Sequence, residues 1–446
     1  MRLQFMKLIF LFFGCYTYSQ NKLDAYIKTG LQNNEVVKQH HFNINRSLWA
    51  LKEAKSLFYP STSLNANYTV ADGGRTIAIP IGDMLNPVYA TLNQMTNSNA
   101  FPSLENQSVL LNPNNFYDAK VHTTMPLLNY EIIYNKRIKA FQNDLQKIEL
   151  EIYKRELVKN IKIAYYKYIQ STEAIAIYET ALKLTRENQR VNQVLFKNDK
   201  INRTAVLRSD NEVKRIEAQL EEARQNSKNA QAYFNFLINR KLDSQIAIDT
   251  DTSSIPVAFD SENTTAREEF SKLKTASELN TTLSKLTQSF WFPKLSAFID
   301  FGLQDFDFEV NKQSRYYFGG VALEWNIFSG NKNTYKRKQI EEEGKSILSQ
   351  TDHVKQQLLL QYEVNRNKLL AKIERYRSEK NQNIAAKKYN DDISKLYKEG
   401  QVIYIEVLDA QNQYINSLLN SNIAFYETWI AFAELERANA TYTINF

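Results

Sequence analysis

The strongest constraint in this sequence of 446 residues is the near absence of helix-breaking residues from two long stretches. No glycine or proline occurs between Pro126 and Pro256, and the stretch from Asn331 to the C-terminus holds only Gly344 and Gly400. Ordinary globular domains place a turn about every dozen residues. The two stretches therefore predict helices far longer than a single globular core requires.

Apolar residues recur at steps of three and four in the first stretch and at heptad-like steps of three, four and seven in the second, which is typical of a coiled-coil seam. The first stripe comprises Leu150, Tyr153, Leu157, Ile161, Ala164 and Tyr168, and the second Leu408, Ile415, Leu418, Phe425, Trp429 and Phe432. We predict coiled-coil helices over residues 129–240 and 329–441. A helical leg of about 65 residues extends about 100 Å.

Each predicted helix pair contains one turn-like interruption. In the first pair it is Asn198-Asp199-Lys200, whose Asn and Asp tolerate the left-handed conformation better than most residues. In the second pair it is Gly400, which reaches positive φ without steric cost. We predict that the chain reverses at both places.

Four segments of about ten residues alternate apolar and polar side chains, which predicts strands with one apolar face. They form two pairs, over residues 59–128 and 292–328, and the first pair encloses a long stretch rich in Pro, Asn and Ser that predicts an irregular loop. This length and alternation are typical of transmembrane β-barrel strands. A small soluble antiparallel sheet is the other interpretation of the same pattern.

The order of these elements predicts an internal repeat of helix, strand pair and long helix pair. Helices are predicted at residues 21–58 and 264–291, before each strand pair, and residues 241–263 form an Asp-, Ser- and Thr-rich connector. Corresponding positions lie about 200 residues apart: Pro126 matches Asn326 (326 − 126 = 200), and Phe196 matches Tyr397 (397 − 196 = 201).

Residues 1–20 read as a secretory signal peptide, because a basic start precedes a short apolar core and small exit residues. Cys15 is the only cysteine, so the exported chain is predicted to lack disulfides and thiolate metal sites. Lipidation at Cys15 is the competing interpretation. Loss of Arg2 and Lys7 lowers the formal charge from +7 to +5 (7 − 2 = 5), which does not indicate nucleic-acid binding.

Four strands cannot close a barrel, and an open strand edge in lipid leaves backbone groups without partners. If the strands lie in a membrane, several chains must share one barrel. An exported chain of this plan fits the outer membrane, with its helices in the periplasm.

The whole mature chain resembles the TolC-like outer-membrane efflux proteins. The resemblance rests on the duplicated layout, on Tyr59-Pro60 and Phe292-Pro293 at the strand starts, on Trp325-Asn-Ile-Phe-Ser-Gly330, and on Tyr397-x-x-Gly400-x5-Glu406-Val-Leu-Asp409-Ala-Gln411. It implies a homotrimer with a shared twelve-stranded barrel and a long α-helical periplasmic tunnel, with the connector near the tunnel's equator. It also implies docking to a periplasmic adaptor protein and an inner-membrane transporter.

The resemblance also assigns residues. Glu406 and Asp409 match two acidic positions at the tunnel's inner mouth in that family and are the predicted pore gate. The predicted adaptor-contacting turns comprise Asn198, Asp199, Lys200, Tyr397, Gly400, Gln401 and Val402. Read without the family, the two acids are solvated residues at a helix N-terminus, where the helix dipole favours negative charge.

Two positions depart from the family pattern. The family's gate is tied by a tyrosine, an arginine and a carboxylate, whereas the arginine position here is Val402 and the first-half carboxylate position is Ala205. We therefore expect this tunnel to be held shut by other contacts.

Nothing in the sequence predicts an enzyme. His40, His41, His122 and His353 show no metal-ligand spacing, and there is no phosphate-binding glycine loop, nucleophile elbow or cofactor motif. Three functions remain: an export duct for small molecules, which we favour; a duct for type I secretion of polypeptides; and a structural or adhesive coiled-coil trimer without a channel.

Overall fold

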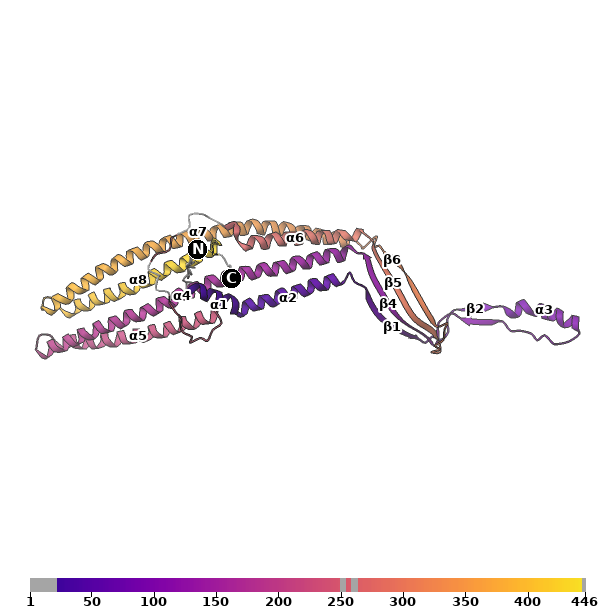
Figure 1. Ribbon diagram of the computed structural model, residues 1–446, viewed down its shortest axis with the longest axis horizontal. Helices are drawn as coiled ribbons and strands as arrows, with labels where there is room; N and C mark the ends of the chain where they lie inside the picture. Colours follow the sequence, from indigo (N-terminus) through magenta and orange to yellow (C-terminus); the bar gives the residue numbers. More distant parts are fainter. Residues whose placement is uncertain (1–21, 249–253, 258–263, 443–446) are drawn as a thin grey trace, which may run out of the picture. The chain divides into compact units, whose positions relative to one another are not determined.

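The structure is a computed structural model that describes residues 22–248, 254–257 and 264–442 (Figure 1). The predicted signal peptide, including Cys15, lies outside the described residues. The chain forms two compact units, called here the helical unit and the strand unit. The helical unit comprises Met1–Ser47, Phe141–Glu278 and Gly344–Phe446, and the strand unit comprises Leu48–Ala140 and Leu279–Glu343.

The strand unit contains a four-stranded antiparallel sheet in the order β1-β4-β5-β6 (Figure 1). Its strands are β1 (Ser61–Thr69), β4 (Phe116–Leu128), β5 (Lys294–Phe306) and β6 (Arg315–Glu324). β1 and β6 pair on one side only, so they form the two edges of the sheet. The two strand pairs come from segments of the chain that lie more than 160 residues apart, and β4 and β5 join them.

The register places apolar side chains of all four strands in one row. Leu64 of β1 lies opposite Val121, which lies opposite Phe301, which lies opposite Tyr317 of β6. All four side chains are exposed in the chain, Tyr317 to 80%. Around this row the face of the sheet is apolar and exposed, and at its far end the ring of Phe308 stacks on Tyr68 and on the buried Tyr117.

The opposite face of the sheet carries a polar network. Asp300 of β5 is buried and contacts the imidazole of His122, and its second oxygen lies 3.6 Å from Lys120 Nζ. The Tyr316 hydroxyl donates a hydrogen bond of 2.7 Å to Asp118. One face apolar and one polar is the alternation predicted from the sequence.

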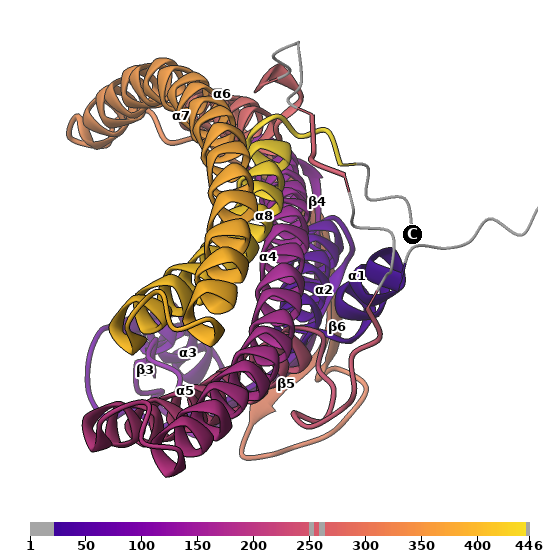
Figure 2. The same ribbon diagram turned by 90° about the vertical axis from the view of Figure 1, so that its left-hand side faces the viewer.

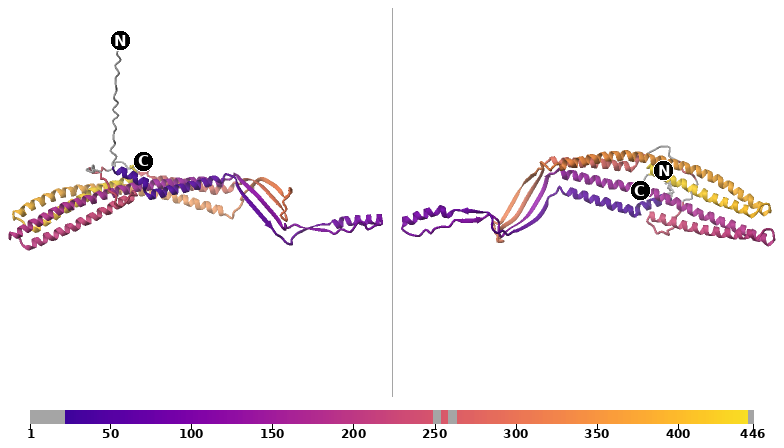
Figure 3. Two further views of the ribbon diagram at one scale, coloured as in Figure 1. Left: turned by 60° about the horizontal axis from the view of Figure 1, so that its bottom comes forward. Right: turned by 180° about the vertical axis from the view of Figure 1, so that it is seen from behind.

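The segment between β1 and β4 is more ordered than the predicted irregular loop. It holds β2 (Thr76–Ile79), helix α3 (Ile81–Thr96) and β3 (Gln107–Leu110), and β2 pairs with β3 (Figure 3). Two of the Asn residues that predicted a loop instead form side-chain hydrogen bonds to the backbone of the returning chain. Asn86 exchanges two hydrogen bonds with the backbone of Leu104, of 2.9 and 2.8 Å, and Asn93 does the same with Phe101.

Helices form most of the chain. They are α1 (Lys22–Asn33), α2 (Glu35–Ser56), α4 (Tyr130–Lys197), α5 (Arg203–Leu237), α6 (Glu268–Gln288), α7 (Lys332–Lys398) and α8 (Tyr404–Ala438). Helices α4 and α7 have 68 and 67 residues, which matches the long legs expected from the missing glycines and prolines. In the part of the chain that the structure describes, no helix has both the length and the apolar character of a membrane span.

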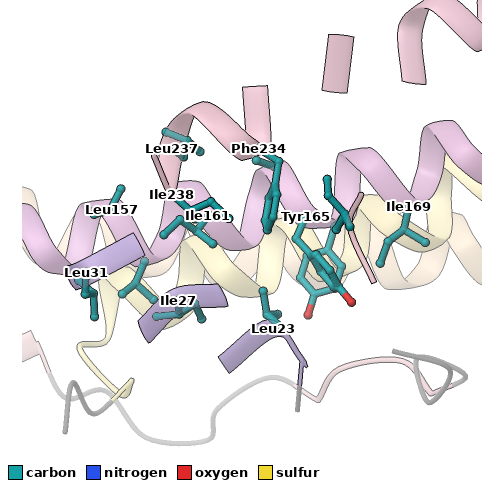
Figure 4. Packing of buried hydrophobic residues seen from close by; sticks show 14 of the residues in the cluster. Leu23, Ile27, Leu31, Leu157, Ile161, Tyr165, Ile169, Phe234, Leu237 and Ile238 are labelled. Carbon is teal, nitrogen blue, oxygen red and sulfur yellow. The ribbon is translucent and has the colours of Figure 1, made fainter. Parts of the chain in front are cut away.

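In the helical unit, α4 and α5 form one antiparallel hairpin, and α7 and α8 form another (Figures 1 and 2). The largest core packs α1 against α4 and the end of α5 (Figure 4). Ile27, Ile161 and Ile238 are fully buried there. Gly30 allows the close approach, because a Cβ at this position would lie 2.5 Å from Ile161 Cδ1.

The connector between the two repeats packs on this core. Ile246 is buried, and the backbone N–H of Ala247 donates a hydrogen bond of 2.9 Å to the hydroxyl of Tyr26. Residues 241–248 and 254–257, the described part of the connector, contain no regular helix or strand.

A network of charged side chains ties the start of α6 to α4 and to the end of α8. Glu269 accepts hydrogen bonds from Arg267 (2.7 Å) and from Arg437 (2.8 Å), and Glu268 pairs with Arg155. Burial disfavours the charged form of Glu269, but the hydrogen bond from Arg267 and the charge of Arg437 outweigh it and lower its pKa to about 2.

This network predicts acid sensitivity. Because the pKa of Glu269 is lower in the folded chain than its usual value of 4.5, its stabilisation is present above about pH 4.5 and is lost as the pH falls towards 2. We expect Glu269→Gln to remove up to about 2 kcal/mol at pH 7 and to flatten the loss of stability between pH 7 and pH 3. Urea unfolding followed by circular dichroism at both pH values measures this. The exposed Glu363 provides the control Glu363→Gln, and an equal acid response in all three proteins contradicts the prediction.

Candidate functional site

The two hairpin turns share one backbone geometry. At the end of α4, Asp199 has φ 53°, and the N–H of Lys200 donates to the carbonyl of Leu195 (2.9 Å). At the end of α7, Gly400 has φ 74°, and the N–H of Gln401 donates to the carbonyl of Leu396 (3.0 Å). Both are the helix-ending motif in which a left-handed residue closes the last turn.

The helices that leave the two turns begin differently. Helix α5 has Asn202 as its N-cap, whose side-chain oxygen accepts from the N–H of Ala205 (3.3 Å). Helix α8 has Ile403 at the equivalent place, which has no side chain that can cap. Glu406 lies in the first turn of α8, where a carboxylate stabilises the helix end.

An apolar cluster, called here the tip cluster, joins the two hairpins beside their turns. Its buried members are Ala205, Ile393, Tyr397, Tyr404, Val407 and Ala410, and Val402 packs against them. Val402 and Ala205, the two positions that depart from the family's gate, both belong to this apolar packing. Hydrophobic contact therefore stands at the two positions where the sequence resemblance led us to expect charged side chains.

Two tyrosines are central to the tip cluster. The hydroxyl of Tyr397 donates a hydrogen bond of 2.5 Å to Asn192 Oδ1 on α4, inside the protein, and the rings of Tyr397 and Tyr404 lie 5.8 Å apart. Burial raises the pKa of both phenols above the usual value of about 10, so both are neutral near pH 7.

Gln411 makes the second polar link between the hairpins. Its side chain is fully buried; its amide N–H donates to the hydroxyl of Thr185, and its oxygen accepts from Asn188 Nδ2 (2.7 Å). Sequence reasoning included Gln411 only as a letter of the motif and missed Asn192. Neither residue can be recognised from the sequence as buried, because polar residues on a long helix usually face solvent.

The predicted gate residues face away from the tip cluster. Glu406 and Asp409 are exposed, whereas Val407 and Ala410 between and beside them are buried. Asp409 accepts a hydrogen bond of 2.7 Å from Gln413 on its own helix. Their carboxylates are therefore free to interact with solvent or with another molecule, and their role at a tunnel mouth stays a prediction.

The predicted adaptor-contacting residues differ in exposure. Asn198, Asp199, Lys200, Gly400 and Gln401 are exposed, Val402 is partly buried, and Tyr397 is only 7% exposed. Tyr397 therefore packs the tip from within, and the surface of the turns is formed by the other residues.

A groove of about 900 Å³ separates the two turns. Its walls combine apolar side chains, of which Ile403 and Ile405 are exposed to 65% and 45%, with the charged residues Lys200, Arg208, Lys398 and Glu399. Among the described residues, no three His, Cys, Asp or Glu side chains are grouped to hold a metal ion.

No protein-family model and no curated protein sequence matches this chain. Solved structures do. The Campylobacter jejuni outer-membrane channel CmeC has a TM-score of 0.74 at 13% identity over 94% of this chain and 85% of its own. The Vibrio cholerae outer-membrane protein VceC gives 0.72 at 12% identity, over 94% and 95%. The Neisseria gonorrhoeae outer-membrane channel MtrE gives 0.73 at 13% identity, over 94% and 88%.

The chain has the fold of the TolC-like outer-membrane channels. The resemblance inferred from the sequence is thereby confirmed at the level of the fold. Within this TolC-like fold, the hairpin turns and the tip cluster are the parts for which the sequence offered specific residue assignments. The apolar tip cluster and its two buried polar links join the hairpins at this end, and on the surface Arg215 of α5 donates a hydrogen bond to Asn412 of α8.

The Tyr397–Asn192 link predicts that the hairpin tips loosen when the hydroxyl is removed. Tyr397→Phe leaves a buried oxygen of Asn192 without its donor, which costs about 1–3 kcal/mol. We expect faster hydrogen–deuterium exchange of backbone amides in the last turns of α4 and α7. Tyr389→Phe, at a 40% exposed tyrosine of the same helix, is the control. Unchanged exchange in Tyr397→Phe shows that the hydrogen bond does not hold the tips.

Proposed function

We propose that three copies of this chain form an outer-membrane duct that exports small molecules. The observation that carries the proposal is the four-stranded sheet, which has one exposed apolar face and two unpaired edges. In lipid each unpaired backbone group costs several kcal/mol, so edge strands must pair with another copy. Three copies supply twelve strands (3 × 4 = 12), the closed barrel implied by the resemblance.

The helical hairpins complete the duct in this proposal. Four helices per chain, two of them of 67 and 68 residues, suit the wall of a long periplasmic tunnel. The apolar faces of the pairs pack within the chain, and charged side chains remain outside for water or a lumen. The fold shared with outer-membrane channels supports this placement.

The hairpin turns are the proposed docking surface for a periplasmic adaptor, which couples the duct to an inner-membrane transporter. Exposed Ile403 and Ile405 lie beside three cations, Lys200, Arg208 and Lys398, and one anion, Glu399, so this surface combines apolar area with a net positive charge. Such a surface suits a partner segment that has apolar residues and acidic neighbours.

Purified protein tests the duct directly. We expect a trimeric mass by light scattering in detergent and stepwise conductance in planar bilayers. Protein without conductance supports the structural or adhesive alternative. Deletion of the gene separates the two cargo classes: sensitivity to dyes, detergents and antibiotics supports small-molecule export, whereas loss of a secreted polypeptide supports type I secretion.

The proposed gate has its own test. Two carboxylates in each of three chains bring six negative charges to one aqueous mouth (2 × 3 = 6), where a trivalent cation binds and blocks the current. We expect Glu406→Ala with Asp409→Ala to weaken block from the periplasmic side by about tenfold or more, since each lost charge removes attraction at close range. Glu363→Ala is the control. Block that is unchanged in the double variant removes these residues from the gate.

A further inference from the structure

Helix α3 carries an apolar stripe with coiled-coil spacing. Its members follow one another at steps of four, three, four and three: Ile81, Leu85, Val88, Leu92 and Met95. Alternating steps of this kind keep side chains on one seam of a helix, which packs against another helix.

The described chain leaves this stripe uncovered. Leu85, Val88 and Met95 are exposed to 38%, 52% and 79%, and Ile81 and Leu92 are half-buried. No helix among the described residues covers the three exposed members of the stripe.

Another side of α3 packs on the returning chain. Asn86 and Asn93 bind the returning backbone at Leu104 and Phe101, and the ring of Tyr89 packs on the ring of Phe101 at 5.5 Å. These contacts fix which face of α3 turns outward. Figure 3 shows this excursion of β2, α3 and β3 projecting from the end of the sheet.

The composition of α3 favours a second α3 helix, rather than a lipid surface, as the partner of the stripe. Asp83 is its only charged residue, and this carboxylate accepts a hydrogen bond of 2.9 Å from Asn106 on the returning chain. Helices that lie on a lipid surface are typically rich in Lys and Arg, and α3 has neither. An uncharged seam also meets no repulsion from an identical seam.

The helix is weak by itself. It has 16 residues and contains Pro87, which has no backbone N–H to donate to the preceding turn. Short helices are marginal in water without tertiary packing. Packing of another helix along the stripe would supply the tertiary contacts that the isolated helix lacks.

We propose that the α3 helices of neighbouring copies pack along this stripe as a short parallel coiled coil outside the barrel. The inference rests on the proposed trimer. In that trimer the edge strand β1 pairs with another copy, and the chain continues from β1 into β2 and α3, so the α3 helices of neighbouring copies come close together. A threefold axis brings identical residues of the three copies together. The coil adds a second constriction to the duct, at the end of the sheet where β1 ends and β4 begins.

Single cysteines test the packing. Cys15, the sole cysteine, lies in the predicted signal peptide, so an introduced thiol is expected to be the only one in the exported chain. In detergent-purified complex under mild oxidation, we expect Met95→Cys to form disulfide-linked dimers about tenfold faster than Gln94→Cys, because proximity raises the effective concentration of the thiols. Gln94 is also exposed, but it lies off the stripe. Adding Val88→Asp to Met95→Cys is expected to slow the cross-linking, since it places like charges in the seam.

Light scattering on the unmodified protein distinguishes a failure of the proposed trimer from a failure of the coiled coil alone. A monomer overturns both the duct and the coil. A trimer in which Met95→Cys and Gln94→Cys cross-link at the same rate overturns the coil alone. If lipid vesicles, rather than trimer formation, protect the Met95→Cys thiol from a water-soluble maleimide, the stripe lies on a membrane surface and the inference fails.

Discussion

The unpaired backbone of two edge strands is the constraint on which the rest of this structure depends. β1 and β6 each satisfy one side of their hydrogen-bonding groups within the chain. The face that carries Leu64, Val121 and Phe301 is at the same time apolar and exposed. In water such a sheet invites aggregation, and in lipid it must be closed. A shared barrel removes both difficulties at once, which is why the proposed function requires more than one copy.

The hairpin tips combine two equivalent backbone turns with apolar and polar contacts between the hairpins. Their backbone turns are equivalent, with Asp199 and Gly400 in the same left-handed conformation 201 residues apart (400 − 199 = 201). The tip cluster between them is apolar, and its buried polar links are Tyr397 with Asn192 and Gln411 with Thr185 and Asn188. On the surface, the guanidinium of Arg215 donates a hydrogen bond to Asn412. Neutral buried links are strong only when every partner is present.

The segment between β1 and β4 shows that composition alone predicted the wrong local structure, an irregular loop in place of two strands and a helix. Pro and Asn are common in irregular loops, and the sequence predicts one there. In the structure, Asn86 and Asn93 replace missing backbone partners of a returning chain, and Pro87 lies within helix α3. The stripe from Ile81 to Met95 is readable in the sequence at helical spacing, but the surrounding loop residues conceal it.

The sequence by itself determined the long helices, the four alternating strands, the reversals near Asp199 and Gly400 and the TolC-like fold. The helices, strands and reversals follow from local periodicity and from the positions of glycine and proline, which act over a few residues, whereas the TolC-like fold was inferred from the resemblance of sequence motifs to a known family. Only the tertiary structure decided the pairing of β4 with β5, the burial of Tyr397 and Gln411, and the outward direction of Glu406 and Asp409. Those facts depend on which helix or strand lies beside which. Contacts between residues some 200 positions apart leave no local pattern in the chain.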